Sequence, residues 1–380
     1  MRKILYVVSN VYDSKEFEGL IANWDRSRFG LEFIFFNAQP DCSIQRVIRA
    51  AGYRCGTITY KGIRHAPRAL AALMRYLRES RPDVVHANLL EASFFTMLAG
   101  RLTGIGRLVH TRHHTLHNHK YHPVRGVLYD RIINRLSHWI IAVAQNVVDV
   151  LVTMENVPPG KVVLIHHGFD LRTAREPDPI RTAHLRQKYG FVEGGPWPVI
   201  GVISRPFEWK GLDHIIPAFA NLLRDHPNAR LMLFHWTGGA HSERYERMLE
   251  PLPRRSWRTV RWETFVDDLF PMFDVFVHVP EDRLSEAFGF VYVETLTTGT
   301  PSVLTNSGIL YELDPARLEG ISVVPFKDPA AIEAAMRHWV RERIPPERRL
   351  AMARVNTAYL NTMISAERKM ERLYDFYARA

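Results

Sequence analysis

The sequence predicts an α/β protein with two doubly wound parallel sheets, one in each half of the chain, facing a cleft. Short runs that are apolar throughout alternate with helical patterns, which is typical of parallel strands covered by helices on both faces. This alternation stops at a turn-rich stretch over residues 172–198 and then restarts. A chain of 380 residues is long enough for two such domains.

The first domain is expected to span residues 1–175. Seven apolar runs predict its strands, at residues 4–9, 31–36, 56–59, 84–87, 107–111, 139–143 and 162–166. Periodic apolar positions between them predict helices at residues 66–78, 91–103 and 125–136.

Residues 176–198 are expected to form a linker, because this segment is rich in proline and glycine. The second domain then spans 199–362, with strands expected at 199–204, 230–234, 259–262, 275–279, 301–305 and 321–324. Its helices are expected at 212–224, 242–250, 290–297 and 330–343. Residues 363–380 are expected to form a final helix that packs back on the first domain.

Composition excludes several classes of protein. Hydrophobic residues at 46% and charged residues at 24% are the proportions of a globular protein. No apolar stretch approaches the ~20 residues that a membrane span needs, and the short run after Met1 predicts a first strand rather than a signal peptide. The two cysteines, Cys42 and Cys55, are too few for a disulfide scaffold or a four-cysteine zinc site, and favour a reducing cytosol.

The net charge of +10 belongs to the first half of the chain. Residues 1–175 hold 24 lysines and arginines against 13 acidic residues. Such asymmetry is typical of a surface that meets a polyanion, an anionic membrane or an anionic substrate, although an idle basic surface remains an alternative. A nucleic-acid-binding protein is a second alternative, but the sequence contains no lysine and arginine run and no helix-turn-helix pattern.

Two basic residues follow the first strand of the second domain. Arg205 comes directly after the strand, and Lys210 precedes Gly211 at the start of a helix. Cations at the carboxyl end of a parallel strand and beside a helix N-terminus suit an anionic ligand such as a diphosphate. By themselves, two such residues are also common on protein surfaces.

Two glutamates flank a glycine where a later strand leads into a helix. Glu286 and Glu294 lie eight residues apart, or about 12 Å along a helix, which is too far for the opposed carboxylates of a glycosidase. Two separate contacts to one extended ligand fit this spacing better, with Gly289 allowing close approach of the backbone. The segment 305–308, which contains Ser307, adds a further loop rich in backbone N–H groups.

Taken together, these motifs resemble the donor site of glycosyltransferase family 4. The ordered set comprises Arg205 with Lys210, Glu286 with Glu294, and the segments 299–301 and 305–308. The first half agrees, since residues 81–87 and 166–170 resemble family segments at a helix-to-strand junction and at the end of the N-terminal domain. The resemblance implies a retaining enzyme with the GT-B fold of two Rossmann-like domains.

The resemblance also implies roles for individual residues. Arg205 and Lys210 would hold the diphosphate of a UDP- or GDP-linked sugar and stabilise its departing charge. Glu286 would contact the sugar hydroxyls, and Glu294 would accept hydrogen bonds from the ribose. The remaining donor-binding residues would be Phe288, Gly289, Phe290 and Ser307. No metal or other cofactor is expected.

A histidine-rich segment follows the fifth expected strand. The resemblance places a catalytic histidine here, and His113 is the best match, with His114 and Arg112 expected on the acceptor side. Six histidines between 110 and 122 also allow a metal site, but no carboxylate accompanies them within the segment, and a loop that gates the acceptor is favoured. The family's glycine pair after the first strand is absent, and residues 10–14 read Asn-Val-Tyr-Asp-Ser instead.

The expected function is transfer of a sugar, with retention, to a lipid-linked or surface-polysaccharide intermediate. Five arginines on or beside the expected helix 66–78 favour peripheral attachment at the inner face of a membrane; they are Arg64, Arg68, Arg75, Arg78 and Arg81. The alternatives are a soluble small-molecule acceptor and a GT-B enzyme of another reaction type, such as an epimerase or a phosphorylase.

Overall fold

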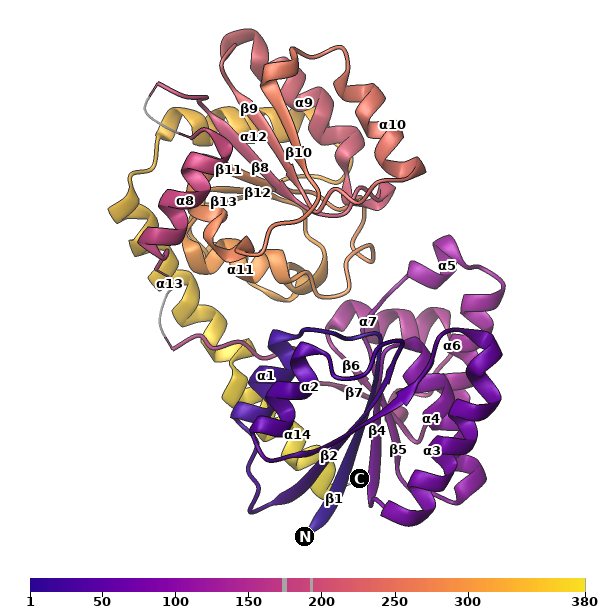
Figure 1. Cartoon of the computed structure of the whole chain (residues 1–380). Coiled ribbons are helices and arrows are strands. Elements are labelled where there is room, and N and C mark those ends of the chain that lie inside the picture. The colour runs from indigo at the N-terminus through magenta and orange to yellow at the C-terminus, as the bar shows by residue number, and fades with distance from the viewer. Residues whose placement is uncertain (173–175, 192–193, 380) are drawn as a thin grey trace. The chain divides into compact units, whose positions relative to one another are not determined.

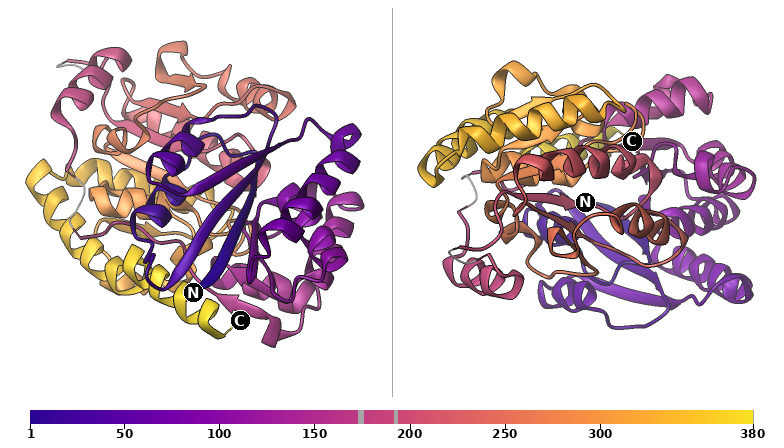
Figure 2. Two further views of the ribbon diagram at one scale, coloured as in Figure 1. Left: turned by 60° about the horizontal axis from the view of Figure 1, so that its bottom comes forward. Right: turned by 90° about the horizontal axis from the view of Figure 1, so that it is seen from above.

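The computed structural model describes residues 1–172, 176–191 and 194–379 and divides into two compact units (Figure 1). Unit 1 comprises Met1–Asp170 together with Met363–Ala380, and unit 2 comprises Leu171–Thr362. The two chain termini both belong to unit 1 and lie close together (Figure 2), where Arg2 Nη1 donates a hydrogen bond of 2.9 Å to the carbonyl oxygen of Ala378.

The sheet of unit 1 is parallel throughout, in the order β3-β2-β1-β4-β5-β6-β7. Its strands are β1 Arg2–Ser9, β2 Phe29–Asn37, β3 Arg54–Thr59, β4 Val84–Asn88, β5 Leu108–Arg112, β6 Trp139–Ala142 and β7 Val162–Leu164. The strand order reverses between β1 and β4. In doubly wound sheets ligands bind at the carboxyl ends of the strands beside such a reversal.

Helices cover both faces of this sheet, which explains why its inner strands β1, β4 and β5 are buried along most of their length. One face packs against α1 Lys15–Ala22, α2 Ser43–Ala50 and α14 Ala366–Arg379. The other face packs against α3 Ala66–Ser80, α4 Leu90–Thr103 and α6 Arg125–Leu136. Two shorter helices complete the unit: α5 His117–Tyr121, and α7 Gln145–Asp149, which continues into a π-helical turn at Val150–Met154.

The last helix, α14, is part of the core of unit 1. Its Tyr377 is fully buried, and the Tyr377 hydroxyl lies 2.8 Å from the hydroxyl of Tyr6 and 2.5 Å from Nδ1 of His86. The other nitrogen of His86, Nε2, lies 2.7 Å from the hydroxyl of Thr111. A chain of buried polar groups thus joins the end of the sequence to strands β1, β4 and β5.

The sheet of unit 2 is also parallel, in the order β10-β9-β8-β11-β12-β13, and reverses between β8 and β11. Its strands are β8 Val199–Ile203, β9 Arg230–Phe234, β10 Trp257–Val260, β11 Val275–His278, β12 Ser302–Leu304 and β13 Ile321–Val323. Its helices are α8 Pro179–Tyr189, α9 Leu212–Asp225, α10 Ala240–Leu249, α11 Phe290–Thr298, α12 Pro329–Glu342 and α13 Pro346–Ile364. The prediction of two doubly wound α/β domains is therefore confirmed.

The segment 176–198 differs from the linker that its prolines predicted, because it contains helix α8. Asp178 caps this helix, accepting hydrogen bonds of 3.0 Å from the backbone N–H groups of Ile180 and Arg181. Pro179 occupies the first helical position, where its missing N–H costs nothing. Residues 173–175 and 192–193, which belong to the expected end of the first domain and to the linker, lie outside the described residues. Among the described residues, no helix combines the length and apolar character needed to cross a bilayer.

Candidate active site

The reversal point of unit 2 carries the two predicted basic residues. Arg205 follows β8, and Lys210 ends a short turn that leads into α9. The next residue, Gly211, has a φ of +79°, and a Cβ atom there would lie 2.1 Å from the carbonyl oxygen of Val279 at the end of β11. Glycine therefore lets this turn rest directly on β11, which brings Lys210 to the residues that follow that strand.

Lys210, Glu286 and His278 form a compact ionic cluster at this point. Lys210 Nζ lies 2.5 Å from Glu286 Oε2, and His278 Nε2 lies 3.2 Å from the same oxygen. Burial alone would raise the pKa of Glu286, but the Lys210 ammonium and the His278 hydrogen bond outweigh it and lower the pKa to about 2. Burial also lowers the pKa of His278. The cluster therefore presents a carboxylate that is ionised at neutral pH beside a lysine ammonium.

The side chain of Ser307 holds the backbone of this cluster in place. Its hydroxyl accepts a hydrogen bond of 3.1 Å from the backbone N–H of Glu286 and donates one of 3.0 Å to the carbonyl oxygen of Arg283. Ser307 is fully buried and both bonds are internal, so its side chain holds the backbone at Glu286, and the expected contact of the 305–308 backbone with a donor stays a prediction. Phe288 is likewise buried, at 4% exposure, and only its backbone could approach a ligand.

The start of α11 presents the other predicted donor residues. Gly289 precedes the helix with a φ of +79°, and the side chain of Phe290 is 44% exposed. Unpaired N–H groups at a helix start attract anions. Glu294 lies one turn further along α11 and is half-buried. Arg205 is exposed, and its guanidinium carbon lies 4.9 Å from the ring centre of Phe207.

The reversal point of unit 1 holds a second cluster, built around His113. Its Nε2 lies 3.1 Å from Oδ1 of Asn88, which ends β4. Its ring stacks on His167, with centres 5.5 Å apart and planes inclined by 25°. Nδ1 of His167 lies 3.1 Å from Oε1 of Glu16 in α1, and Nζ of Lys369 in α14 lies 3.0 Å from that same oxygen.

The charge balance of this cluster keeps His113 neutral. Burial is the main cause that lowers the pKa of His113 to about 4, and the neighbouring Lys369 and His167 add to it against the opposing charge of Glu16. Burial favours the protonated form of Glu16, but the charges of His167 and Lys369 outweigh it and hold its pKa well below the usual range. A neutral imidazole can accept a hydrogen bond from a sugar hydroxyl, which is the chemistry expected of a histidine in this position.

The atoms of this cluster also include three possible metal ligands. Among the described residues, Glu16, His113 and His167 have ligand atoms that lie within 4.8 Å of one another. Lys369 already places a positive charge at the Glu16 carboxylate, and a divalent cation there would have to overcome its repulsion. The electrostatics of the cluster therefore favour a hydrogen-bonded site over a metal site.

Arg112 and the histidines beyond His113 lie differently from what we expected. Arg112 is only 3% exposed and forms ion pairs with the buried carboxylates of Asp130 and Glu155, so its predicted contact with an acceptor is corrected to an internal one. His114 and His119 approach the same two carboxylates. The carboxylates that the histidine segment itself lacks are thus supplied by other parts of the chain.

Sequence reasoning missed several residues of both clusters. His278 was placed only inside the expected strand 275–279, although a histidine near the carboxyl end of a buried strand was a usable signal. Glu16, Asn88 and Lys369 are brought to His113 from distant parts of the chain, and no local pattern marks them. His167 was noted only as part of a family segment.

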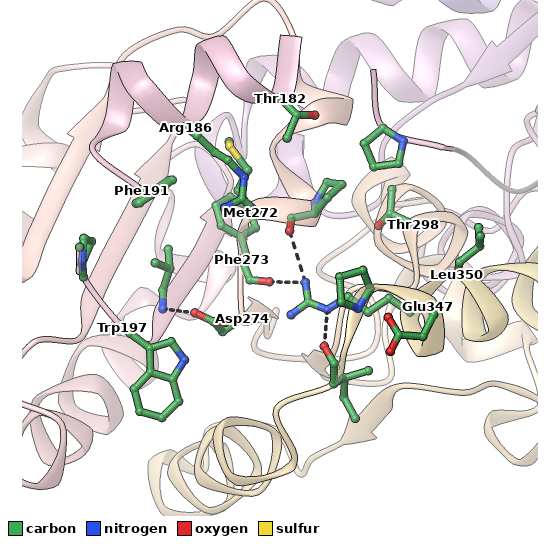
Figure 3. Close-up of a pocket in the computed structure, with 18 of the residues that line it drawn as sticks. Thr182, Arg186, Phe191, Trp197, Met272, Phe273, Asp274, Thr298, Glu347 and Leu350 are labelled. Carbon is green, nitrogen blue, oxygen red and sulfur yellow. Dashed lines mark hydrogen bonds between the residues drawn. The ribbon is translucent and has the colours of Figure 1, made fainter. Parts of the chain in front are cut away.

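A cavity of about 910 Å³ lies at the opposite edge of the unit 2 sheet (Figure 3). It is lined by Val199, which begins β8, and by Asp274, which precedes β11, so it faces the amino ends of the strands. Two of the charged groups drawn there bond to the backbone: Asp274 Oδ2 accepts from the N–H of Val199 at 2.7 Å, and Arg349 Nη1 donates to the carbonyl oxygen of Phe273 at 2.8 Å. None of the predicted donor residues lines this cavity.

Two models of known protein families match the chain, one in each half. A model described as Glycosyltransferase Family 4 matches residues 27–173, and one described as Glycosyl transferases group 1 matches residues 185–356. The chain belongs to glycosyltransferase family 4. The sequence-based identification of the family and of the enzyme class is thereby confirmed.

Individual relatives of this family 4 chain are distant. The chain is 26% identical to mannosylfructose-phosphate synthase of Agrobacterium fabrum over 196 residues, which is 49% of this chain and 41% of that protein. HepE of Anabaena, crystallised with UDP and glucose, matches along the whole of both chains with 18% identity and a TM-score of 0.77. WaaG, a glycosyltransferase involved in lipopolysaccharide biosynthesis, matches over 98% of this chain and 99% of its own with 17% identity and a TM-score of 0.68. These structures confirm the GT-B fold.

Proposed function

We propose that this family 4 chain transfers a sugar from a nucleoside diphosphate donor, UDP- or GDP-linked, with retention of configuration and without a metal. The observation that carries the proposal is the cluster of Lys210, Glu286 and His278 at the reversal point of unit 2. It combines a cation for a diphosphate with an ionised carboxylate for sugar hydroxyls. HepE, the similar structure from Anabaena, holds UDP and glucose.

Each group has a separate part in the proposed reaction. Lys210, Arg205 and the N-terminus of α11 stabilise the negative charge that grows on the diphosphate as it leaves. Lys210 can do so because a single ammonium has three N–H donors and need not give up Glu286. Glu286 accepts hydrogen bonds from the sugar, Glu294 accepts from the ribose, and His113 in unit 1 accepts from the reacting sugar. The retention and the lack of a metal rest on the family resemblance.

A panel of nucleotide sugars tests this proposal. Thermal unfolding and donor hydrolysis would be measured with UDP- and GDP-linked sugars, with the free nucleoside diphosphates as controls. We expect one base to raise the melting temperature and one sugar of that series to be hydrolysed. Failure of every member to bind or turn over would refute the donor assignment.

We further propose a lipid-linked acceptor presented at an anionic membrane surface. The five arginines on and beside α3 are exposed, and none of their side chains forms a hydrogen bond or ion pair with a described residue. Near the helix, Ile63 is 72% exposed. Each basic residue near an anionic leaflet contributes about 1 kcal/mol, screened by salt. WaaG's role in lipopolysaccharide biosynthesis favours such an acceptor, whereas the similarity to mannosylfructose-phosphate synthase favours a soluble one.

Vesicle sedimentation separates these two acceptors. The chain should bind anionic vesicles at low salt, bind neutral vesicles weakly, and lose binding when Arg68 and Arg75 are both changed to glutamate. The matched control changes two exposed arginines of unit 2, Arg224 and Arg247, in the same way. Equal binding to both kinds of vesicle, or no binding to either, would make a soluble acceptor the better assignment.

A further inference from the structure

Two buried carboxylates surround the guanidinium of Arg112 in unit 1. Asp130 of α6 lies 2.7 Å from Nη1, and Glu155, just after α7 and its π-helical turn, lies 2.6 Å from Nη2. All three side chains are at most 3% exposed. Asn118 and Asn134 donate further hydrogen bonds of 2.7 and 2.6 Å to the two carboxylates. Burying these charges costs desolvation free energy, and removing one partner leaves the remaining charges buried without compensation.

The same two carboxylates hold the histidine-rich loop. Nε2 of His114 lies 3.5 Å from Asp130, and Nε2 of His119 lies 3.2 Å from Glu155. Asn118 also bonds to Asp130. Three side chains of residues 113–122 therefore contact the two buried carboxylates. The loop is therefore attached from inside along most of its length, including the short helix α5.

Arg112 transmits this attachment to the turn that carries His113. Its Nε donates a hydrogen bond of 3.1 Å to the carbonyl oxygen of His114. This bond spans the backbone of His113, the residue between them. From the other side, the His113 ring is held by Asn88 and His167. The backbone of the turn and the ring of His113 are thus fixed by separate sets of contacts.

The position of Glu155 depends on an uncommon element of structure. Helix α7 widens into a π-helical turn, and the backbone N–H of Glu155 donates a bond of 3.0 Å to the carbonyl oxygen of Val150. Such turns are rare and occur frequently at functional sites. Here the turn delivers a carboxylate into the interior beneath the loop.

We propose that Asp130 and Glu155 are positioning residues for the transfer reaction, which hold Arg112 and the loop 113–122 so that His113 is presented to the reacting sugar. This inference rests on the proposed function of His113. Neither carboxylate touches substrate. Their charges fix Arg112, Arg112 fixes the turn, and the loop histidines secure the remainder of the segment.

The test uses the isosteric variants Asp130→Asn and Glu155→Gln in the full chain. The matched control is Glu263→Gln, which neutralises a carboxylate in unit 2 that is 3% exposed and pairs with Lys188 at 2.7 Å. We expect amide hydrogen exchange over residues 113–122 to quicken at least tenfold in the first two variants only. Their kcat for transfer should fall about tenfold to a hundredfold, with the affinity for the free nucleoside diphosphate unchanged.

The outcomes separate this inference from the proposed function. Wild-type exchange in the loop, or wild-type kcat with a loosened loop, would overturn the positioning role. If the His113→Ala variant keeps full activity, the proposed function of His113 fails, while the exchange data still decide what holds the loop. If neither carboxylate variant folds, His119→Ala, whose ring is 25% exposed, replaces them. It should quicken loop exchange and lower kcat several-fold, and the absence of both effects would refute the inference.

Discussion

The clusters at the two reversal points are built in different ways. In unit 2, Lys210, His278 and Glu286 lie within 76 positions of one another, and all stand at or after strand ends of one sheet. In unit 1, His113 depends on Glu16 near the start of the chain and on Lys369 near its end, which are 353 positions apart. The first cluster comes from two neighbouring strands of one sheet, β8 and β11, and the turns that follow them, whereas the second exists only after the termini have come together. The two should therefore respond differently to mutation and to acid.

The largest effect is expected at the cluster of unit 2. Glu286→Gln removes the ionised carboxylate that pairs with Lys210 and that we expect to contact the sugar. Transfer should fall about a hundredfold to a thousandfold in kcat/KM, a range seen when one preorganised polar group is lost. Steady-state kinetics and thermal unfolding would be measured together. Turnover within twofold of wild type, in a folded variant, would refute the donor-site assignment.

Acid should weaken unit 1 before unit 2. Burial lowers the pKa of His86 to about 3 and is the main cause of the pKa of about 4 for His113, against 6.5 in the unfolded chain. As pH falls, both histidines therefore bind protons in the unfolded state at a higher pH than in the folded state. Their contribution to the free energy of unfolding is complete above pH 6.5 and is lost as pH falls towards 4. The pKa of Glu286 is about 2 in the folded protein, against 4.5 in the unfolded chain. Its contribution to the free energy of unfolding is therefore lost only below pH 4.5.

Between pH 6.5 and 5 each of these two histidines would cost on the order of 2 kcal/mol. In unit 2 the lowered pKa of His278 is partly offset by Glu286, so a smaller loss is expected there. Hydrogen exchange of the full chain at pH 7 and pH 5, corrected for intrinsic rates, would compare β1 and β4 with β8 and β11. Equal loss of protection in the two sheets would contradict the comparison.

A smaller effect is expected for Lys369→Met in α14. This change leaves the Glu16 carboxylate with His167 but without its lysine partner, so the pKa of His113 should rise and kcat should fall about tenfold. Arg368→Met, one residue earlier and exposed, is the matched control. In a double-mutant cycle with Glu16→Gln the two effects should not add. Additive effects would show that the two residues act separately.

The smallest effect is expected on removal of metal ions. We expect EDTA to leave the transfer rate unchanged, because cationic side chains balance the charge in both clusters. The measurement is the initial rate before and after chelation, followed by addition of zinc or manganese. Restoration of a lost rate by either ion would identify Glu16, His113 and His167 as metal ligands.

The sequence predicted most of the strands and two of the three residues of the unit 2 cluster, Lys210 and Glu286, because both leave local patterns. Buried parallel strands are short apolar runs, and Arg205, Lys210 and Glu286 each follow such a run. Helices whose buried faces carry polar side chains were missed. Helix α13 is an example, since its Asn356 is buried and bonds to the backbone N–H and carbonyl oxygen of Glu319, which breaks the apolar period.

The sequence could not show which polar residues face inward. Arg112 and Ser307 were expected at a ligand, but each is buried and bonded within the protein. Their partners, such as Asp130 and Arg283, lie on other elements, so only the packed structure identifies them. A polar residue at a strand end is a candidate for ligand binding. Its side chain can take that role only if the folded protein leaves it accessible.

The placement of α14 has a consequence for biosynthesis. Because one face of the unit 1 sheet is covered by α14, the core of unit 1 cannot be completed while unit 2 is being translated. At ordinary elongation rates this delay lasts on the order of tens of seconds. During that time the face that later receives Tyr374 and Tyr377 is uncovered, while unit 2 emerges as one continuous stretch and can fold. The nascent chain should therefore acquire the cluster of Lys210, His278 and Glu286 before the cluster around His113, and should depend on chaperones until the last helix leaves the ribosome.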